Sequence, residues 1–166
     1  MGITVYYKNI DLMPEELGKG RLAEYPDVRA DSLAAGEEIE FGKAIEYDSE
    51  DDGVVKEFND GTFAGIAMAK HYADYVDKNL VDSDGKEDEV PKYSKYDAVT
   101  VLRKAIVWVE VLESVEKGEK AVIDEETGNF RPADTDEEDV TEVDGMVFKS
   151  AADENELAKL EINLPG

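Results

Sequence analysis

The chain has 166 residues and a formal net charge of −24 at pH 7, because 42 Asp and Glu residues outnumber 18 Lys and Arg residues. This balance excludes a broad nucleic-acid-binding surface, since affinity for a phosphate backbone depends on lysine and arginine. The absence of cysteine excludes disulfides, thiolate metal sites and cysteine nucleophiles. A chain of this length suits a single domain with its own hydrophobic core.

The negative charge has three interpretations: a strongly solvated surface, adaptation to high salt, or mimicry of nucleic acid. We favour solvation, because 42% of the residues are hydrophobic and they gather into short strand-like runs. No apolar run is long enough to span a bilayer, and no basic start leads into an apolar signal segment. We therefore expect a soluble protein of the cytoplasm that binds neither membrane nor nucleic acid.

Residues 1–35 are predicted to form an extended N-terminal arm. The β-prone run Ile3–Tyr7 (ITVYY) comes first, and prolines and glycines interrupt the residues that follow it. Such a stretch fits an arm that reaches a partner, and it fits an ordinary packed extension equally well.

Three short strands are predicted between residues 36 and 70, each bounded by turn residues. They are Glu38–Tyr47, Val54–Phe58 and Thr62–Ala69. Gly65 in the third strand indicates a bulge or a close approach of two backbones. Residues 77–90 are rich in Asp and Glu and have little to bury, so we predict a solvent-exposed acidic loop there.

The stretch Tyr96–Ile123 is predicted to be the middle of a β core, because its β-branched residues crowd a helix but pack well on a pleated sheet. Apolar residues occupy both faces of an extended chain here. One face carries Ala105, Val107, Val109 and Val111, and the other face carries Ile106 and Trp108. Such a strand should be covered on both sides. The pair Arg103-Lys104 interrupts the apolar run, and either a hairpin turn or one continuous strand fits it.

Short strands separated by turns continue to the end of the chain. They are Glu119–Asp124, a strand at Phe130 that Pro132 limits, and the final strand Leu157–Leu164. Residues 134–144 form a second acidic loop in this prediction. Many short strands with turn residues between them are typical of a β-barrel or β-sandwich, so we predict one mainly β domain over residues 36–166 with little helix.

No catalytic or cofactor motif is present. His71 is the only histidine, which excludes a histidine metal cluster, and neither a nucleophile elbow nor a phosphate-binding glycine loop occurs. Residues 82–85 (DSDG) lack the spacing of a calcium loop, although weak calcium binding by an acidic loop stays an alternative. We therefore expect no enzyme activity, no cofactor and no resident metal.

The order of these segments resembles that of the tailed-phage capsid cement, or head-decoration, proteins. The segments that carry the likeness are Gly36–Tyr47 (GEEIEFGKAIEY), Thr62–Ala69 (TFAGIAMA), Val99–Val109 (VTVLRKAIVWV), Val115–Val122 (VEKGEKAV), Thr127–Phe130 (TGNF) and Met146–Asn163 (MVFKSAADENELAKLEIN). Each is short, and their order and spacing together give the likeness its specificity. Two features depart from the family pattern: Ala105 stands where a glycine is expected, and the two acidic insertions are long.

The resemblance implies a mostly β structural protein without catalytic residues. It implies a homotrimer that is made in the host cytoplasm, binds the major capsid protein on the outside of the phage head, and reinforces the shell. We expect the arm to contact the capsid, because a β-prone segment can add to a sheet edge of a partner. The candidate capsid-contact residues are Ile3, Val5, Tyr6 and Tyr7. The candidate core or subunit-interface residues are Ile106, Val107, Trp108 and Val109.

Two other classes remain alternatives. An acidic mimic of nucleic acid, or another protein-binding inhibitor, is compatible with the charge, but the apolar strand faces argue against a mainly mimetic surface. A carbohydrate-binding or hydrolytic β domain would need an aromatic platform beside paired carboxylates, and Trp108 is the only tryptophan. Adaptation to high salt is compatible with the capsid interpretation.

Overall fold

The computed structural model describes residues 18–70 and 92–166, and the regular structure of these residues is entirely β. The prediction of a mainly β fold is thereby confirmed. Within the described ranges there is no helix long and apolar enough to cross a membrane. Residues 1–17 of the predicted arm and the whole predicted acidic loop 77–90 lie outside the described residues.

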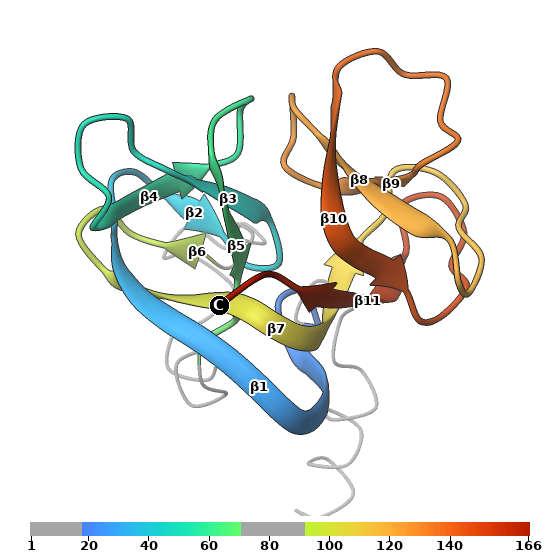
Figure 1. Ribbon diagram of the computed structural model, residues 1–166, viewed down its shortest axis with the longest axis horizontal. Coiled ribbons are helices and arrows are strands. Elements are labelled where there is room, and N and C mark those ends of the chain that lie inside the picture. The colour runs from blue at the N-terminus through green and yellow to red at the C-terminus, as the bar shows by residue number, and fades with distance from the viewer. Residues whose placement is uncertain (1–17, 71–91) are drawn as a thin grey trace, which may run out of the picture.

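The described residues form eleven strands, nine in one mixed sheet and two in a separate pair (Figure 1). Their bounds are β1 Leu22–Ala35, β2 Ile39–Glu40, β3 Ala44–Tyr47, β4 Val54–Glu57, β5 Phe63–Ala67, β6 Lys92–Tyr93, β7 Ala98–Glu110, β8 Lys120–Asp124, β9 Phe130–Pro132, β10 Val140–Phe148 and β11 Leu157–Asn163. The sheet order is β1-β4-β3-β5-β7-β11-β10-β8-β9, and β2 pairs with β6.

Strand β7, 13 residues long, organises the sheet. Its first half pairs with β5 and its second half with β11, while β1 runs antiparallel along its other edge. β1 also pairs in parallel with β4 through Ala34 and Ala35. The strands β1, β4, β3, β5 and β7 therefore form a closed circuit of pairings.

A second circuit closes at the second half of β7. The strands β11, β10, β8 and β9 follow from its second half. Val111, which directly follows β7, makes a parallel bridge back to Phe130 in β9. Figure 1 shows these circuits as two lobes that share β7. The molecule is accordingly not a clear barrel.

The hydrophobic core consists of two clusters of buried side chains. One lies in the first lobe and includes Ile39, Ile45 and Val101. The larger one fills the second lobe, and it reaches across β7 to Phe58 and Ile66 of the first lobe. This apolar contact holds the two lobes against one another.

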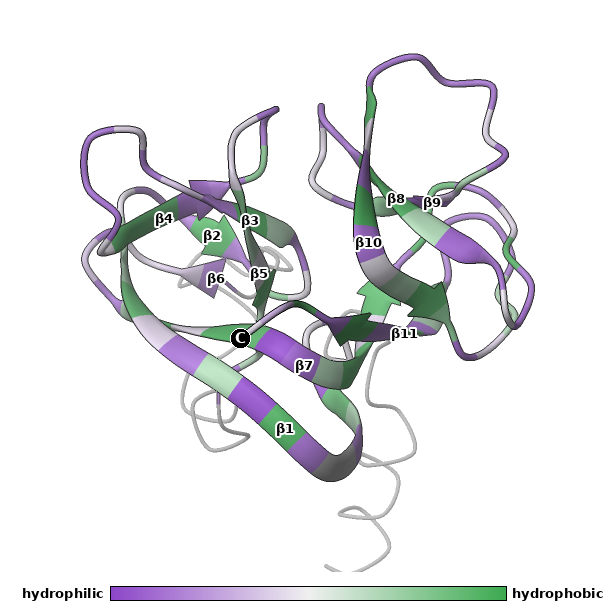
Figure 2. Ribbon diagram, viewed as in Figure 1, coloured by the Kyte–Doolittle hydropathy of each residue, from purple (hydrophilic) through white to green (hydrophobic). Residues whose placement is uncertain are grey.

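The pair Arg103-Lys104 lies in the middle of a continuous strand, which decides between the two alternatives left open above. Figure 2 shows it as a hydrophilic interruption of β7. Arg103 donates hydrogen bonds to the Tyr47 hydroxyl at 2.7 Å and to the Ala64 carbonyl at 3.1 Å. Lys104 pairs with Asp27 of β1. Because both charges have partners within the sheet, the strand continues without a turn.

Gly65 confirms the expected bulge and close approach. The pairing of β3 with β5 shifts register next to Gly65, whose φ is +153°. A Cβ at this position would lie 2.4 Å from the carbonyl oxygen of Leu102 in β7. The missing side chain therefore lets β5 lie directly against β7.

Three sequence-based expectations were wrong in detail. The irregular chain expected up to residue 35 is instead strand β1 from Leu22 to Ala35, which gains its hydrogen bonds from β7. Glu38–Tyr47 is split into β2 and β3, because Gly42 turns the chain with a φ of +78°. The acidic loop predicted for residues 134–144 ends where β10 begins at Val140 and pairs with β8.

Candidate functional site

The residues singled out in β7 separate into two faces, as their alternation predicted. Val107 and Val109 have no exposed surface and belong to the larger core cluster. Ile106 and Trp108 are half-buried and lie on the opposite face of the strand. The arm residues Ile3, Val5, Tyr6 and Tyr7 lie outside the described residues.

The outer β7 face, defined here by Ile106, Trp108 and their neighbours across the strands, mixes apolar and charged side chains. Trp108 is paired with Lys159 of β11, whose Nζ lies 5.5 Å from the centroid of the indole ring. Ile106 lies between Glu24 of β1 and Glu161 of β11. Two apolar side chains within a charged rim are typical of a protein contact surface.

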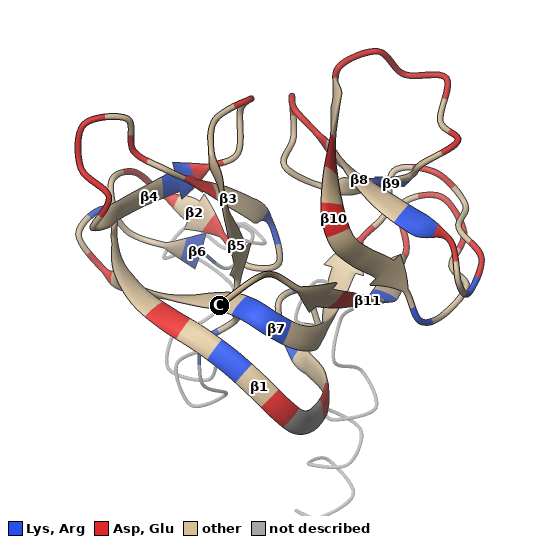
Figure 3. Ribbon diagram, viewed as in Figure 1, with Lys and Arg blue, Asp and Glu red and all other residues tan. Residues whose placement is uncertain are grey.

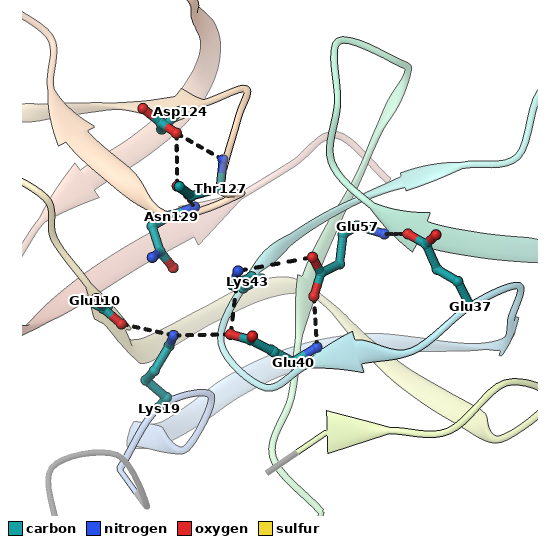
Figure 4. Close-up of polar contacts among 9 residues, drawn as sticks. All are labelled: Lys19, Glu37, Glu40, Lys43, Glu57, Glu110, Asp124, Thr127 and Asn129. Atoms are coloured by element: carbon teal, nitrogen blue, oxygen red, sulfur yellow. Dashed lines mark hydrogen bonds and ion pairs between the residues drawn. The ribbon is translucent and has the colours of Figure 1, made fainter. Parts of the chain in front are cut away.

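A polar network lies between the two lobes (Figure 4). Lys19 is only 5% exposed, and its Nζ lies 2.9 Å from Glu110 Oε2 and 3.7 Å from Glu40 Oε2. Glu110 ends β7 and Glu40 belongs to β2, so the lysine connects the start of the described chain to both strands. A buried ammonium group requires such carboxylate partners, because an unpaired buried charge is very costly.

Lys43 and Glu57 extend this network towards β4. Lys43 Nζ lies 3.3 Å from Glu40 Oε2 and 3.9 Å from Glu57 Oε2. The other oxygen of Glu57 accepts a hydrogen bond from the Glu40 backbone N–H at 3.0 Å. Because these carboxylates already have cationic or amide partners, the network is a structural connection between strands.

Asp124 organises the turn between β8 and β9. Its Oδ1 accepts hydrogen bonds from the Thr127 backbone N–H at 2.9 Å and from the Thr127 hydroxyl at 2.8 Å, and its Oδ2 accepts one from Arg131 Nε at 2.8 Å. Burial alone would raise the pKa of Asp124, but the hydrogen bonds from Arg131 and Thr127 outweigh it and leave the pKa below its ordinary value.

Arg131 also holds a second carboxylate. Its NH1 lies 3.0 Å from Glu113 Oε2, an oxygen that also accepts a hydrogen bond from the Thr135 hydroxyl. The Thr135 hydrogen bond is the main cause that lowers the pKa of Glu113, burial opposes it, and Arg131 adds to the lowering. Two carboxylates and one guanidinium thus connect β9 to the segment after β7.

The same turn touches the first lobe. The Ala44 backbone N–H donates to the Gly128 carbonyl at 2.9 Å. Asn129 beside it is buried, and its Oδ1 accepts no hydrogen bond from the described residues. The sequence identified Thr127-Gly128-Asn129 only as a turn. The sequence feature that indicates the hydrogen-bonded structure of this turn is Asp124, which stands three residues before a threonine. At this spacing an aspartate side chain caps a turn.

The remaining candidate residues from the sequence do not form a metal site among the described residues. In residues 18–70 and 92–166, no group of three or more Asp, Glu or His side chains is placed to hold a metal ion. The calcium alternative for residues 82–85 and the role of His71 concern residues outside those ranges.

Acidic and basic residues are distributed unevenly over the molecule (Figure 3). Asp and Glu fill the loops at one end of both lobes, including residues 48–52 and 134–139. Strands β1 and β7 together carry three basic residues and four acidic ones, so charges of both signs lie along them. These loops are therefore strongly negative, and the centre of the sheet is closer to neutral.

Comparisons with known proteins identify the family. The sequence model described as "Structural cement protein (E217 gp24/Pam3 gp6)" matches residues 7–163. A chain in the solved structure "The capsid of Myoviridae Phage XM1" is 14% identical, with a TM-score of 0.63 and coverage of 87% of this chain and 89% of that chain. A chain in "The crystal structure of head fiber gp8.5 N base in bacteriophage phi29" is 16% identical, with a TM-score of 0.43 and coverage of 81% and 93%. No curated protein matches the sequence.

The XM1 likeness has low sequence identity and shows a shared fold. The family match defines a structural protein of phages, of the cement class. The chain belongs to the structural cement protein family, whose sequence model spans nearly its whole length. The resemblance noted from the order of the sequence segments is thereby confirmed.

Proposed function

We propose that this protein binds the outer surface of a phage head at junctions between coat subunits and stabilises the shell. The observation that carries the proposal is the family match over residues 7–163. The net charge of −24 supports a position on the outside, because it disfavours both adsorption to nucleic acid and non-specific self-association. In this role the protein acts by binding the major capsid protein, without catalysis and without a cofactor.

We further propose that the protein acts as a homotrimer. A trimer that touches several coat subunits gains effective concentration for each contact after the first, so weak contacts add up to firm attachment. Trp108 and Ile106 on the outer β7 face are the candidate contact between copies. The mixture of apolar and charged groups there supports this assignment.

The proposal is tested by comparing phage heads assembled with and without the protein. We expect heads that carry it to retain their DNA at higher temperature, and we expect added protein to restore this resistance to heads that lack it. Electron microscopy of the two kinds of head should show extra density on the outer surface between coat subunits. Equal thermal resistance together with no extra density would refute the proposed function.

The arm is tested separately. If Ile3–Tyr7 contacts the capsid, a variant that lacks residues 1–10 should leave heads partly unoccupied while its melting temperature stays near that of the full chain. Full occupancy by the shortened chain would exclude the arm as a required contact and leave the rest of the proposal standing.

A further inference from the structure

Tyr96 combines two unusual properties. Its side chain is 80% exposed, and among the described large hydrophobic residues the only other exposed one is Val28, at 38%. Its backbone has a φ of +74°. Bulky L residues rarely adopt this conformation, because the side chain crowds the backbone.

The choice of residue at this position is not explained by the backbone. Four residues other than glycine have a positive φ in the described part of the chain. The other three are Asp27, Asp60 and Asn155. Asp and Asn tolerate the left-handed region well, whereas tyrosine does not. Asparagine or glycine would therefore suit the local conformation of residue 96 better than the tyrosine that is there.

The surrounding turn holds Tyr96 firmly in this conformation. Its backbone N–H donates to the Ala35 carbonyl at 2.8 Å, and the Ala35 N–H donates to the Asp97 carbonyl at 2.9 Å. Asp97 Oδ2 accepts hydrogen bonds from the Ser94 N–H at 2.9 Å and from Lys70 Nζ at 2.8 Å. The turn between β6 and β7 is thus fixed to the end of β1, and the Tyr96 side chain projects from a rigid base.

The two tyrosines of this turn have opposite environments. Tyr93 is buried, and its hydroxyl donates to the Met68 carbonyl at 2.6 Å, so it supports the core. Tyr96 is largely exposed, and Lys95 Nζ lies 5.1 Å from the centroid of its ring. The exposed ring and its stacked lysine contribute little to the core of the domain, yet they occupy a position where the conformation disfavours them.

We propose that Tyr96, together with Lys95, is an anchor that inserts into an apolar pocket with an acidic rim on the coat protein. The inference rests on the proposed function and names the residue that makes the contact. Rigid, exposed tyrosines are frequent among the residues that dominate binding energy. A strained backbone retained around such a side chain indicates that the side chain is used.

The coat protein fits this anchor better than a second copy of the chain does. A symmetric contact between two Tyr96 side chains would bring the two Lys95 ammonium groups together, and like charges repel. An asymmetric contact would need an exposed apolar surface to receive the ring. Among the described residues Val28 is the only other exposed large hydrophobic side chain, and the half-buried Ile106 and Trp108 of the outer β7 face are already assigned to the proposed contact between copies.

The test compares capsid affinity with thermal stability for the full-length chain and three variants. Tyr96→Asn removes the ring and suits the positive φ, so its melting temperature should equal or exceed that of the wild type. Its affinity for heads that lack the protein should fall about thirty-fold, the loss typical of a removed anchor. Tyr96→Phe keeps the ring and should bind within about three-fold of the wild type. Asn155→Gly changes another positive-φ position and should leave affinity unchanged.

Each result supports or overturns the inference. Wild-type affinity in Tyr96→Asn would overturn it, and so would a marked drop in the melting temperature, because Tyr96 would then be a structural residue. If the variant lowered the molar mass of the free protein in solution, the partner would be a second copy, which would overturn the assignment to the coat. If the wild type itself failed to bind heads, the proposed function would be refuted independently of Tyr96.

Discussion

Single residues decide how closely the strands approach one another, and Gly65 is the clearest case. We expect Gly65→Ala to lower the free energy of unfolding by about 3 kcal/mol or more, because it adds a clash to an unfavourable backbone conformation. The added Cβ would lie 2.4 Å from the Leu102 carbonyl oxygen, and that backbone cannot move without disturbing the β5–β7 pairing. Urea unfolding at neutral pH measures the change.

Gly118 provides the matched control for this prediction. Its φ of +96° is also unfavourable for alanine, but no atom lies within 4 Å of the position of an added Cβ. Gly118→Ala should therefore cost only the conformational part, about 1–2 kcal/mol. Equal losses in the two variants would show that the close approach at Gly65 is not what makes glycine necessary there.

Replacing Trp108 tests whether the outer β7 face belongs to the core or forms a contact between copies. We expect Trp108→Ala to reduce the molar mass of the protein in solution, measured by light scattering, while the far-ultraviolet circular dichroism of the separated chains stays native. The free energy of unfolding should fall by less than about 2 kcal/mol, because the side chain is only half-buried. An unfolded variant, or an oligomer of unchanged mass, would remove the outer β7 face from the proposed trimer contact.

At the scale of elements, the β8–β9 turn depends on ionised carboxylates. Because the pKa of Asp124 is lower in the folded chain than in the unfolded one, its contribution to stability is complete above the unfolded value of about 3.9 and is lost as the pH falls through the folded value. Asp124→Asn should be about 3 kcal/mol less stable than the wild type at pH 7, since Arg131 loses a buried partner.

The sign of this effect can be checked by unfolding both proteins in urea at pH 7 and at pH 3. The stability difference between wild type and Asp124→Asn should shrink at pH 3, because this pH lies below the unfolded value of about 3.9 and the unfolded carboxylate is then mostly protonated. The exposed residue Asp134 serves as the control, and Asp134→Asn should change stability by less than about 0.5 kcal/mol at pH 7. A difference that stays constant from pH 7 to pH 3 would contradict the role assigned to the Asp124 charge.

The sequence predicts a strand well where a run of apolar residues is buried and turn residues mark its ends. β5, β8, β9 and β11 were expected within one or two residues, because apolar runs and turn residues mark them. β1 and the start of β10 were missed for the same physical reason. Charged residues interrupt their apolar pattern and most of their side chains are at least partly exposed, so their strand conformation comes from hydrogen bonds to β7 and β8, to which the local sequence gives no clue.

The candidate site could be predicted only in part. The alternation of apolar residues in β7 correctly separated Val107 and Val109 from Ile106 and Trp108, since that pattern depends on the period of a strand. The strain at Tyr96 and the pairing of Lys19 with Glu110 were not predictable, because both arise from chain segments that meet only in the folded molecule.

The whole molecule carries far more negative than positive charge. If repulsion among carboxylates limits stability, raising sodium chloride from 0.15 M to 1 M should increase the melting temperature, because the Debye length falls from about 8 Å to about 3 Å. Ion pairs weaken at the same time, but with a net charge of −24 the repulsion should dominate. Scanning calorimetry measures the shift. Neutralising Asp136, Glu137, Glu138 and Asp139 should reduce the salt dependence, and a flat response in the wild type would contradict the premise.

The two circuits that share β7 also affect how copies behave when they are crowded. Each strand of the nine-stranded sheet has neighbours on both sides over at least part of its length, since β1 joins β4 to β7 and Val111 bridges the outer side of β9. An open strand edge is a template on which further copies can add and grow into fibres. Within the described residues, the nine-stranded sheet therefore leaves no strand edge open along its whole length, which disfavours such growth if many copies lie close together on one shell as proposed.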